Sequence, residues 1–192
     1  IGVNDGTITG SYFNGTVTTG NSSGDYEVGP IGGLIGRNDD NGTIADCYAI
    51  ATVTSEVGYG IGGLVGSNSG SINDSHTVCT VTGNYAVGGL VGGNDSDSTI
   101  GNSYADGGVT GNTLVGGLTG CNHFTITDSY FTGTVTATGD RSGGLAGESY
   151  GSIEGCHAHA TVTSTGDYVG GLAGFSLGAT NSYATGSVTG DS

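Results

Sequence analysis

The side chains of this sequence best suited to binding a metal ion are aspartates in short polar segments. Asp39 and Asp40 are adjacent, Asp5 holds the equivalent place one repeat earlier, and Asp95 and Asp97 form a second group. Oxygen-rich segments of this kind can bind calcium, which would also relieve the repulsion between like charges. Neither group has the spacing of an EF-hand loop or of a nine-residue calcium repeat. We expect solvated acidic turns, with calcium binding as the alternative and no other cofactor.

The residues that carry most enzyme chemistry do not converge. In Cys156-His157-Ala158-His159, strand alternation sends the cysteine to one face and both histidines to the other, whereas zinc needs converging ligands. No Ser-His-Asp set converges when the repeats are aligned. We therefore predict that the chain is not an enzyme. Paired exposed carboxylates leave a polysaccharide-active β-helix enzyme as a distant alternative.

Recurring Thr-Val-Thr sequences predict a surface that binds without catalysis. The threonines are Thr16, Thr18, Thr52, Thr54, Thr80, Thr82, Thr110, Thr134, Thr136, Thr161, Thr163 and Thr189, with Gly108 and Ser187 interrupting one row. Rows spaced ~6.6–6.8 Å along a strand and ~4.8 Å between strands form a flat, uncharged grid. This grid resembles the Thr-x-Thr faces of insect ice-binding proteins, so ice is a candidate ligand. The alternative is that threonine is simply a favourable exposed strand residue.

An aromatic column is expected beside the threonines. Its members are Tyr12, Tyr48, His76, Tyr104, Tyr130, His157 and Tyr183. Stacked rings stabilise a fold by about 0.5–1.5 kcal/mol per pair. An exposed row of rings can also bind carbohydrate or another copy of the protein. We favour structural stacking and keep ligand binding as the alternative.

The elements that must position these side chains are set by a repeat. Gly-Gly-Leu-x-Gly occurs six times, and its leucines are Leu34, Leu64, Leu90, Leu118, Leu145 and Leu172. Successive leucines are 30, 26, 28, 27 and 27 residues apart. A period of this length is typical of one coil of a solenoid, which buries its apolar side by stacking on copies of itself.

Three short strands are predicted for each coil. After the pentapeptide come a polar turn, an isoleucine, and a phrase of the type Ser-Tyr-Ala-x-Gly-x-Val-Thr. Period-two alternation points its valines inward: Val17, Val53, Val81, Val109, Val135, Val162 and Val188. Glycine density and the lack of a 3.6-residue period exclude helices. We expect residues 1–192 to form one all-β domain, a right-handed parallel β-helix of about seven coils.

Charge excludes several partners. The 192 residues include 17 Asp and Glu but only two Lys and Arg, giving a net charge of −15. Nucleic acid needs several cationic contacts, so it is excluded as a partner. No apolar run approaches the ~20 residues of a membrane span, and we expect no membrane insertion in this segment.

The four cysteines are expected to be free. Cys47 and Cys156 fall in the same column but four coils apart, which separates them by ~19 Å. Cys79 and Cys121 fall in other columns, so no pair reaches the ~4.4–6.8 Å Cα separation of a disulfide. We expect small core thiols, which suit an anoxic habitat or a reducing compartment.

Five Asn-x-Ser/Thr triplets are candidate glycosylation sites. They are Asn14, Asn21, Asn41, Asn73 and Asn94. On an exported chain they could carry glycans. Sequences rich in Ser, Thr and Asn contain such triplets by chance, so the signal is weak.

The two recurring phrases together resemble the GLUG-repeat family over nearly the whole chain. That resemblance implies an extended β-solenoid of the kind found in bacterial and archaeal surface and secreted proteins, which include adhesins. It implies no catalysed reaction. We therefore expect an extracellular stalk, spike or filament subunit, cut from a longer repeat array. Its expected partners are further coils of the same chain or other copies end to end, with surface glycans or ice as candidate ligands.

Overall fold

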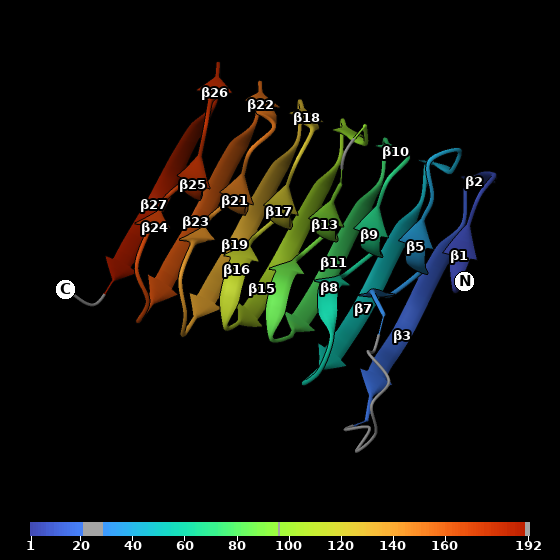
Figure 1. The fold of residues 1–192 in the computed structure, drawn as a ribbon, viewed down its shortest axis with the longest axis horizontal. Coiled ribbons are helices and arrows are strands. Elements are labelled where there is room, and N and C mark those ends of the chain that lie inside the picture. The colour runs from blue at the N-terminus through green and yellow to red at the C-terminus, as the bar shows by residue number, and fades with distance from the viewer. Residues whose placement is uncertain (21–28, 96, 191–192) are drawn as a thin grey trace.

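The computed structural model describes residues 1–20, 29–95 and 97–190. All regular elements in these residues are β-strands, which pair in parallel and form four sheets along one axis (Figure 1). The first strand, β1 (Val3–Asn4), and the last, β27 (Tyr183–Gly190), lie at opposite ends of that axis. No helix that is long and apolar enough to cross a membrane occurs in the described ranges.

In the coils that contain the pentapeptide, the strand of sheet A begins on its fourth residue, and the strand of sheet B follows the next turn. Sheet A contains β1 (Val3–Asn4), β5 (Ile35–Asn38), β9 (Val65–Asn68), β13 (Val91–Asn94), β17 (Thr119–Asn122), β21 (Ala146–Ser149) and β25 (Ala173–Ser176). Sheet B contains β2 (Thr7–Thr9), β6 (Thr43–Ala45), β10 (Ser71–Asn73), β14 (Thr99–Gly101), β18 (Thr125–Thr127), β22 (Ser152–Glu154) and β26 (Ala179–Thr180).

Sheets C and D complete each coil. Sheet C contains the long strands β3 (Tyr12–Thr19), β7 (Tyr48–Ser55), β11 (His76–Thr82), β15 (Tyr104–Gly111), β19 (Tyr130–Ala137), β23 (His157–Ser164) and β27 (Tyr183–Gly190). Sheet D contains β4 (Ile31–Gly32), β8 (Tyr59–Gly62), β12 (Tyr85–Gly88), β16 (Thr113–Gly116), β20 (Ser142–Gly143) and β24 (Val169–Gly170).

Equivalent residues of neighbouring coils lie directly over one another. Val81 pairs with Val53 on one side and with Val109 on the other. The predicted parallel β-helix is therefore confirmed, with three sheets of seven strands and a fourth sheet of six in the described part of the chain.

Sheet D is an addition to the three predicted strands per coil. Its strands end on the first glycine of the pentapeptide, as Gly88 ends β12. The second residue of the strand is in the left-handed region in several coils, with φ of +70° at Gly60, +52° at Ala86 and +56° at Leu114. This kink interrupts the period-two alternation by which strands are recognised in a sequence.

The pentapeptide is rich in glycine because its backbone is crowded. A Cβ on Gly88 would lie 2.1 Å from the carbonyl oxygen of Val91, and one on Gly89 would lie 2.2 Å from that of Gly117. A Cβ on Gly92 would lie 2.3 Å from backbone atoms of the preceding coil. Any side chain at these positions would force the backbone apart, so the motif marks where sheets A and D approach most closely.

The core is a continuous apolar column inside the coils. Leu90, Ile100 and Val109 come from three different sheets or turns of one coil, and their side chains are 0%, 0% and 1% exposed. The equivalent residues of the inner coils are equally buried. At the two ends of the molecule, Leu34 and Leu172 are only partly buried. Each coil thus depends on its neighbours for most of its burial.

An asparagine row runs along the turn after sheet A. Each side-chain amide nitrogen donates to the side-chain oxygen of the next coil. The donor–acceptor distances along Asn4, Asn38, Asn68, Asn94, Asn122 and Ser149 are 2.7, 2.8, 2.8, 2.8 and 3.0 Å. These bonds satisfy buried polar groups and connect each coil from that of Asn4 to that of Ser149 with the next.

All four cysteines are buried and unpaired, as predicted. Cys47, Cys79 and Cys156 belong to the main core. Cys121 does not, because it packs with Ala86 and Leu114 in a small separate cluster between sheets A and D. Cys121 is thus a buried thiol as expected, but in a second, smaller apolar cluster outside the main core.

Candidate functional site

The predicted threonine rows lie on the outer face of sheet C. In the first row, Thr52 pairs with Thr16 and Thr80. The second row lies two residues further along each strand and has the same register. The threonines alternate with buried inward residues, as predicted. The rows comprise Thr16, Thr52, Thr80, Thr134 and Thr161, and Thr18, Thr54, Thr82, Thr110, Thr136, Thr163 and Thr189.

The grid is bordered by a column of mixed chemistry. Ile50 and Val78 are 47% and 50% exposed, and Asp106 and His159 occupy the same column in later coils. A hollow of about 570 Å³ lies over the first coils of this face. The ordered part of the surface is therefore two threonine columns wide.

The aromatic column forms one uninterrupted stack. Tyr12, Tyr48, His76, Tyr104, Tyr130, His157 and Tyr183 follow one another with centroid separations of 4.8–5.3 Å and interplanar angles of 4–11°. Tyr12 and Tyr183, at the ends, are 63% and 58% exposed. The inner rings are half-buried because their faces cover one another, so mainly ring edges remain for a ligand.

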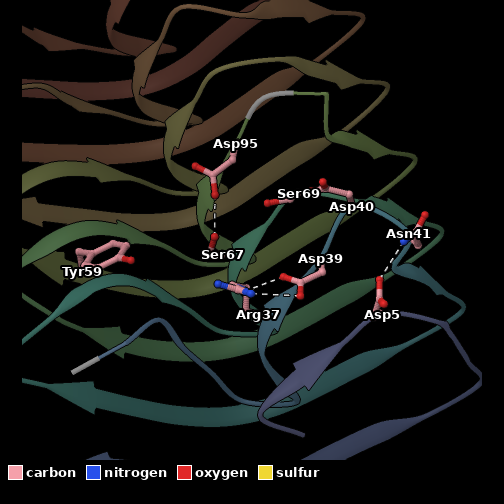
Figure 2. A pocket seen from close by; sticks show the side chains of 9 residues that line it. All are labelled: Asp5, Arg37, Asp39, Asp40, Asn41, Tyr59, Ser67, Ser69 and Asp95. Atoms are coloured by element: carbon pink, nitrogen blue, oxygen red, sulfur yellow. Dashed lines mark hydrogen bonds and ion pairs between the residues drawn. The ribbon is translucent and has the colours of Figure 1, made fainter. Parts of the chain in front are cut away.

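The acidic turns meet on one surface at the corner between sheets A and B (Figure 2). Asp5, Asp39, Asp40 and Asp95 line one hollow of about 530 Å³. Asp97 lines an adjoining hollow of about 480 Å³ together with Asp40 and Asp95. The two predicted groups of aspartates thus share one acidic surface.

The carboxylates of this surface are largely engaged with neighbouring side chains. Arg37 donates from Nη2 to Asp39 at 3.1 Å, and this pairing raises the pKa of the guanidinium. Asn41 donates to Asp5 at 3.1 Å, and Ser67 donates to Asp95 at 2.6 Å. In residues 1–20, 29–95 and 97–190, no three Asp, Glu, His or Cys side chains are grouped as metal ligands.

A fourth feature, a groove between the outer sides of sheets A and D, was not predicted. It is a cavity of about 230 Å³ whose residues include Tyr59, Tyr85, Asp95, Cys121 and Glu148. The tyrosines begin the sheet D strands β8 and β12, which the sequence pattern did not reveal. The only signal was the recurrence of tyrosine about one repeat apart.

The C-terminal end of this groove carries an ion pair whose carboxylate is buried. The Glu148 side chain is 7% exposed and pairs with Arg141, whose guanidinium also lies 5.4 Å from the ring centre of Phe175. Burial of a carboxylate is costly without a partner, and Arg141 supplies it.

The candidate glycosylation sites differ in accessibility. Asn14 and Asn41 are exposed and Asn73 is half-buried. Asn94 is fully buried in the asparagine row, so its amide nitrogen is inaccessible in the folded chain. Asn21 lies outside the described residues.

The comparisons with known proteins give one kind of match. Residues 31–54, 83–110, 111–136 and 138–163 each match the family model described as the GLUG motif, and together they cover more than half of the chain. No curated protein matches the chain, and no solved structure matches it.

Proposed function

The chain belongs to the GLUG-motif family, and on that premise we propose that it is a non-catalytic structural element of an extracellular, adhesin-type protein. It acts as a rigid stalk, surface spike or filament subunit. Members of the family are typically extracellular, which supports the location. Four buried thiols without disulfides suit an anoxic habitat.

The observation that carries this proposal is the unbroken stacking of coils. The seven strands of sheet C are in register from Tyr12 to Gly190. The asparagine and aromatic rows add side-chain contacts between neighbouring coils along the same axis. A repeat protein in which every unit packs on its neighbours extends in one dimension and keeps its shape. Those are the properties that a spacer requires.

The two ends of the solenoid support contacts with further coils. Ile1 and Val3 are 63% and 57% exposed at one end, and Leu177 and Val188 are 69% and 47% exposed at the other. Open strand edges and apolar side chains favour pairing with another strand. We propose that these ends stack on further coils, from the same chain or from other copies end to end.

Immunogold electron microscopy of cells that produce the protein tests the proposal. Antibodies raised against the chain should label the outer surface, spikes or filaments. Label confined to the cell interior would contradict it. A glycan-turnover assay on the chain should show no activity, and a cleaved product would instead support the polysaccharide-active alternative.

The register of the threonine rows favours a second candidate function, binding of ice or carbohydrate on the outer face of sheet C. Thr52→Tyr with Thr80→Tyr disrupts one row while keeping strand propensity, and Thr132→Tyr is the control outside the rows. Absence of thermal hysteresis in the unmodified chain would exclude ice. For a glycan, Tyr104→Ala with Tyr130→Ala should weaken binding more than stability.

A further inference from the structure

The groove between sheets A and D is walled by two tyrosines from consecutive coils. Tyr59 and Tyr85 are partners in the sheet D register, and their side chains are 52% and 47% exposed. Both line the cavity of about 230 Å³. Two neighbouring exposed rings that are not stacked on each other leave their faces available to a ligand.

The floor of the groove is hollow because the residues there are small. Gly60 and Ala86 contribute from sheet D, and Gly93 contributes from sheet A. At Gly93 a Cβ would find its nearest neighbour, the Cys121 sulfur, at 3.5 Å, which is ordinary van der Waals contact. The space is therefore available to a side chain or to a ligand, unlike the crowded positions of the pentapeptide.

A carboxylate also lines the groove, and neither arginine of the chain pairs with it. Asp95 lines the groove and accepts a hydrogen bond from Ser67, and the nearest basic atom among its described neighbours is His123 Nδ1 at 3.9 Å. Both arginines of the chain are already paired, Arg37 with Asp39 and Arg141 with Glu148. With a net charge of −15, the chain offers a negative field to any ligand.

We propose that this groove binds an alkylammonium group, supplied by a lysine side chain of a partner protein or by a small amine. The ammonium lies over the faces of Tyr59 and Tyr85, where cation–π attraction acts within about 6 Å of a ring centre. Asp95 supplies the opposite charge. The alkyl stem covers Ala86 and Leu114, whose side chains form the apolar part of the floor.

Nuclear magnetic resonance titration of the chain tests this assignment. The probes are n-butylammonium, its neutral counterpart n-butanol, and the peptide acetyl-Gly-Lys-Gly-amide with and without acetylation of the lysine. Both charged probes should shift the ring signals of Tyr59 and Tyr85 saturably, and more weakly at 0.5 M than at 0.05 M salt. Tighter binding of the peptide than of the free amine identifies a protein partner, and the reverse identifies a small amine.

Three variants should separate the site from the rest of the surface. Tyr85→Ala and Asp95→Asn should each weaken n-butylammonium binding at least fivefold. Gly93→Val fills the hollow and should abolish binding without lowering the melting temperature. The matched controls are Asp106→Asn and Gly108→Val on sheet C, where a Cβ on Gly108 also has its nearest neighbour at 3.5 Å, and both should bind normally.

The assignment is overturned if the charged probes leave the two tyrosines unchanged, or if n-butanol binds as well as n-butylammonium. Equal losses in Asp95→Asn and Asp106→Asn would also overturn it, because they would indicate a general charge effect. Saturable binding of a neutral oligosaccharide such as cellotetraose in the groove, without ammonium binding, would replace it with a glycan site.

Discussion

Asn68 donates a hydrogen bond from its side-chain amide to Asn94 one coil further along, at 2.8 Å, and both side chains are fully buried. Asn94 in turn donates to Asn122 at 2.8 Å. The sequence separates these residues by a full repeat, so the row exists only if the coils are in register.

Removing one member of this row should destabilise the fold. Asn94→Ala leaves the side-chain oxygen of Asn122 buried without its donor, which costs about 1–3 kcal/mol. Urea unfolding measures the loss. The control is Asn112→Ala, because Asn112 donates to Asn84 on the exposed surface and its loss should cost below about 0.5 kcal/mol. Similar losses in both variants would show that burial of the row is unimportant.

Two adjacent glycines of β13 should respond oppositely to alanine. Gly92→Ala places a Cβ 2.3 Å from the backbone of Gly60 and should cost about 3 kcal/mol or prevent folding. Gly93→Ala has room and should stabilise the strand by about 0.5–1 kcal/mol. Thermal unfolding of both variants checks the pair. A mild effect of Gly92→Ala would contradict the close approach of sheets A and D.

The aromatic column should stabilise inner coils more than end coils. Tyr104 stacks on His76 and on Tyr130, with both centroid separations at 4.8 Å, whereas Tyr183 stacks only on His157 among the described residues. At about 0.5–1.5 kcal/mol per pair, Tyr104→Ala should cost about 1–3 kcal/mol. Tyr183→Ala should cost about half as much. Urea midpoints measure both, and equal values would argue against stacking as the cause.

Buried thiols should make the fold sensitive to alkali. Burial raises the pKa of Cys79 from 9.0 to about 11 and that of Cys121 to about 12. Above pH 9 the thiols ionise in the unfolded chain but stay protonated in the folded chain, which favours unfolding. The contribution of the protonated thiols to stability is therefore complete below pH 9 and is lost as the pH rises toward 11–12.

Cys79→Ala should therefore lose less stability than the unmodified chain between pH 8 and pH 10.5. Alanine already occupies the same column at Ala51 and Ala160, so the substitution fits. Urea unfolding at the two pH values measures the difference. Parallel decreases in the two proteins would contradict the burial of this thiol.

Much of the coil was predictable because its residues recur. Val81, Asn68 and Tyr104 each have counterparts in other coils, and repetition separates inward, turn and outward positions without a structure. The aromatic stack and the threonine rows followed from the same alignment, since a parallel register preserves columns.

Features that depend on two sheets approaching each other were not predictable. Sheet D was missed because left-handed residues such as Ala86 interrupt alternation, and the groove was missed with it. The separate cluster in which Cys121 packs was missed for the same reason, because periodicity shows which residues are equivalent but not which sheet lies against them. Asn94 shows that a short motif says nothing about burial, because its Asn-x-Ser triplet begins on a residue of the buried asparagine row.

The central claim is that equivalent residues of successive coils lie in register along one axis, and spin-label distances test it most directly. Labels are placed on cysteines introduced in one threonine row, in a background without the four native cysteines. Thr18→Cys is paired in turn with Thr110→Cys, Thr136→Cys, Thr163→Cys and Thr189→Cys.

These positions are three, four, five and six coils from Thr18 in the register. At ~4.8 Å per coil, the Cα separations should be about 14, 19, 24 and 29 Å. The account predicts narrow distance distributions that lengthen by one equal step per coil. Distances that fail to increase with coil number, or that alternate between two values, would contradict it.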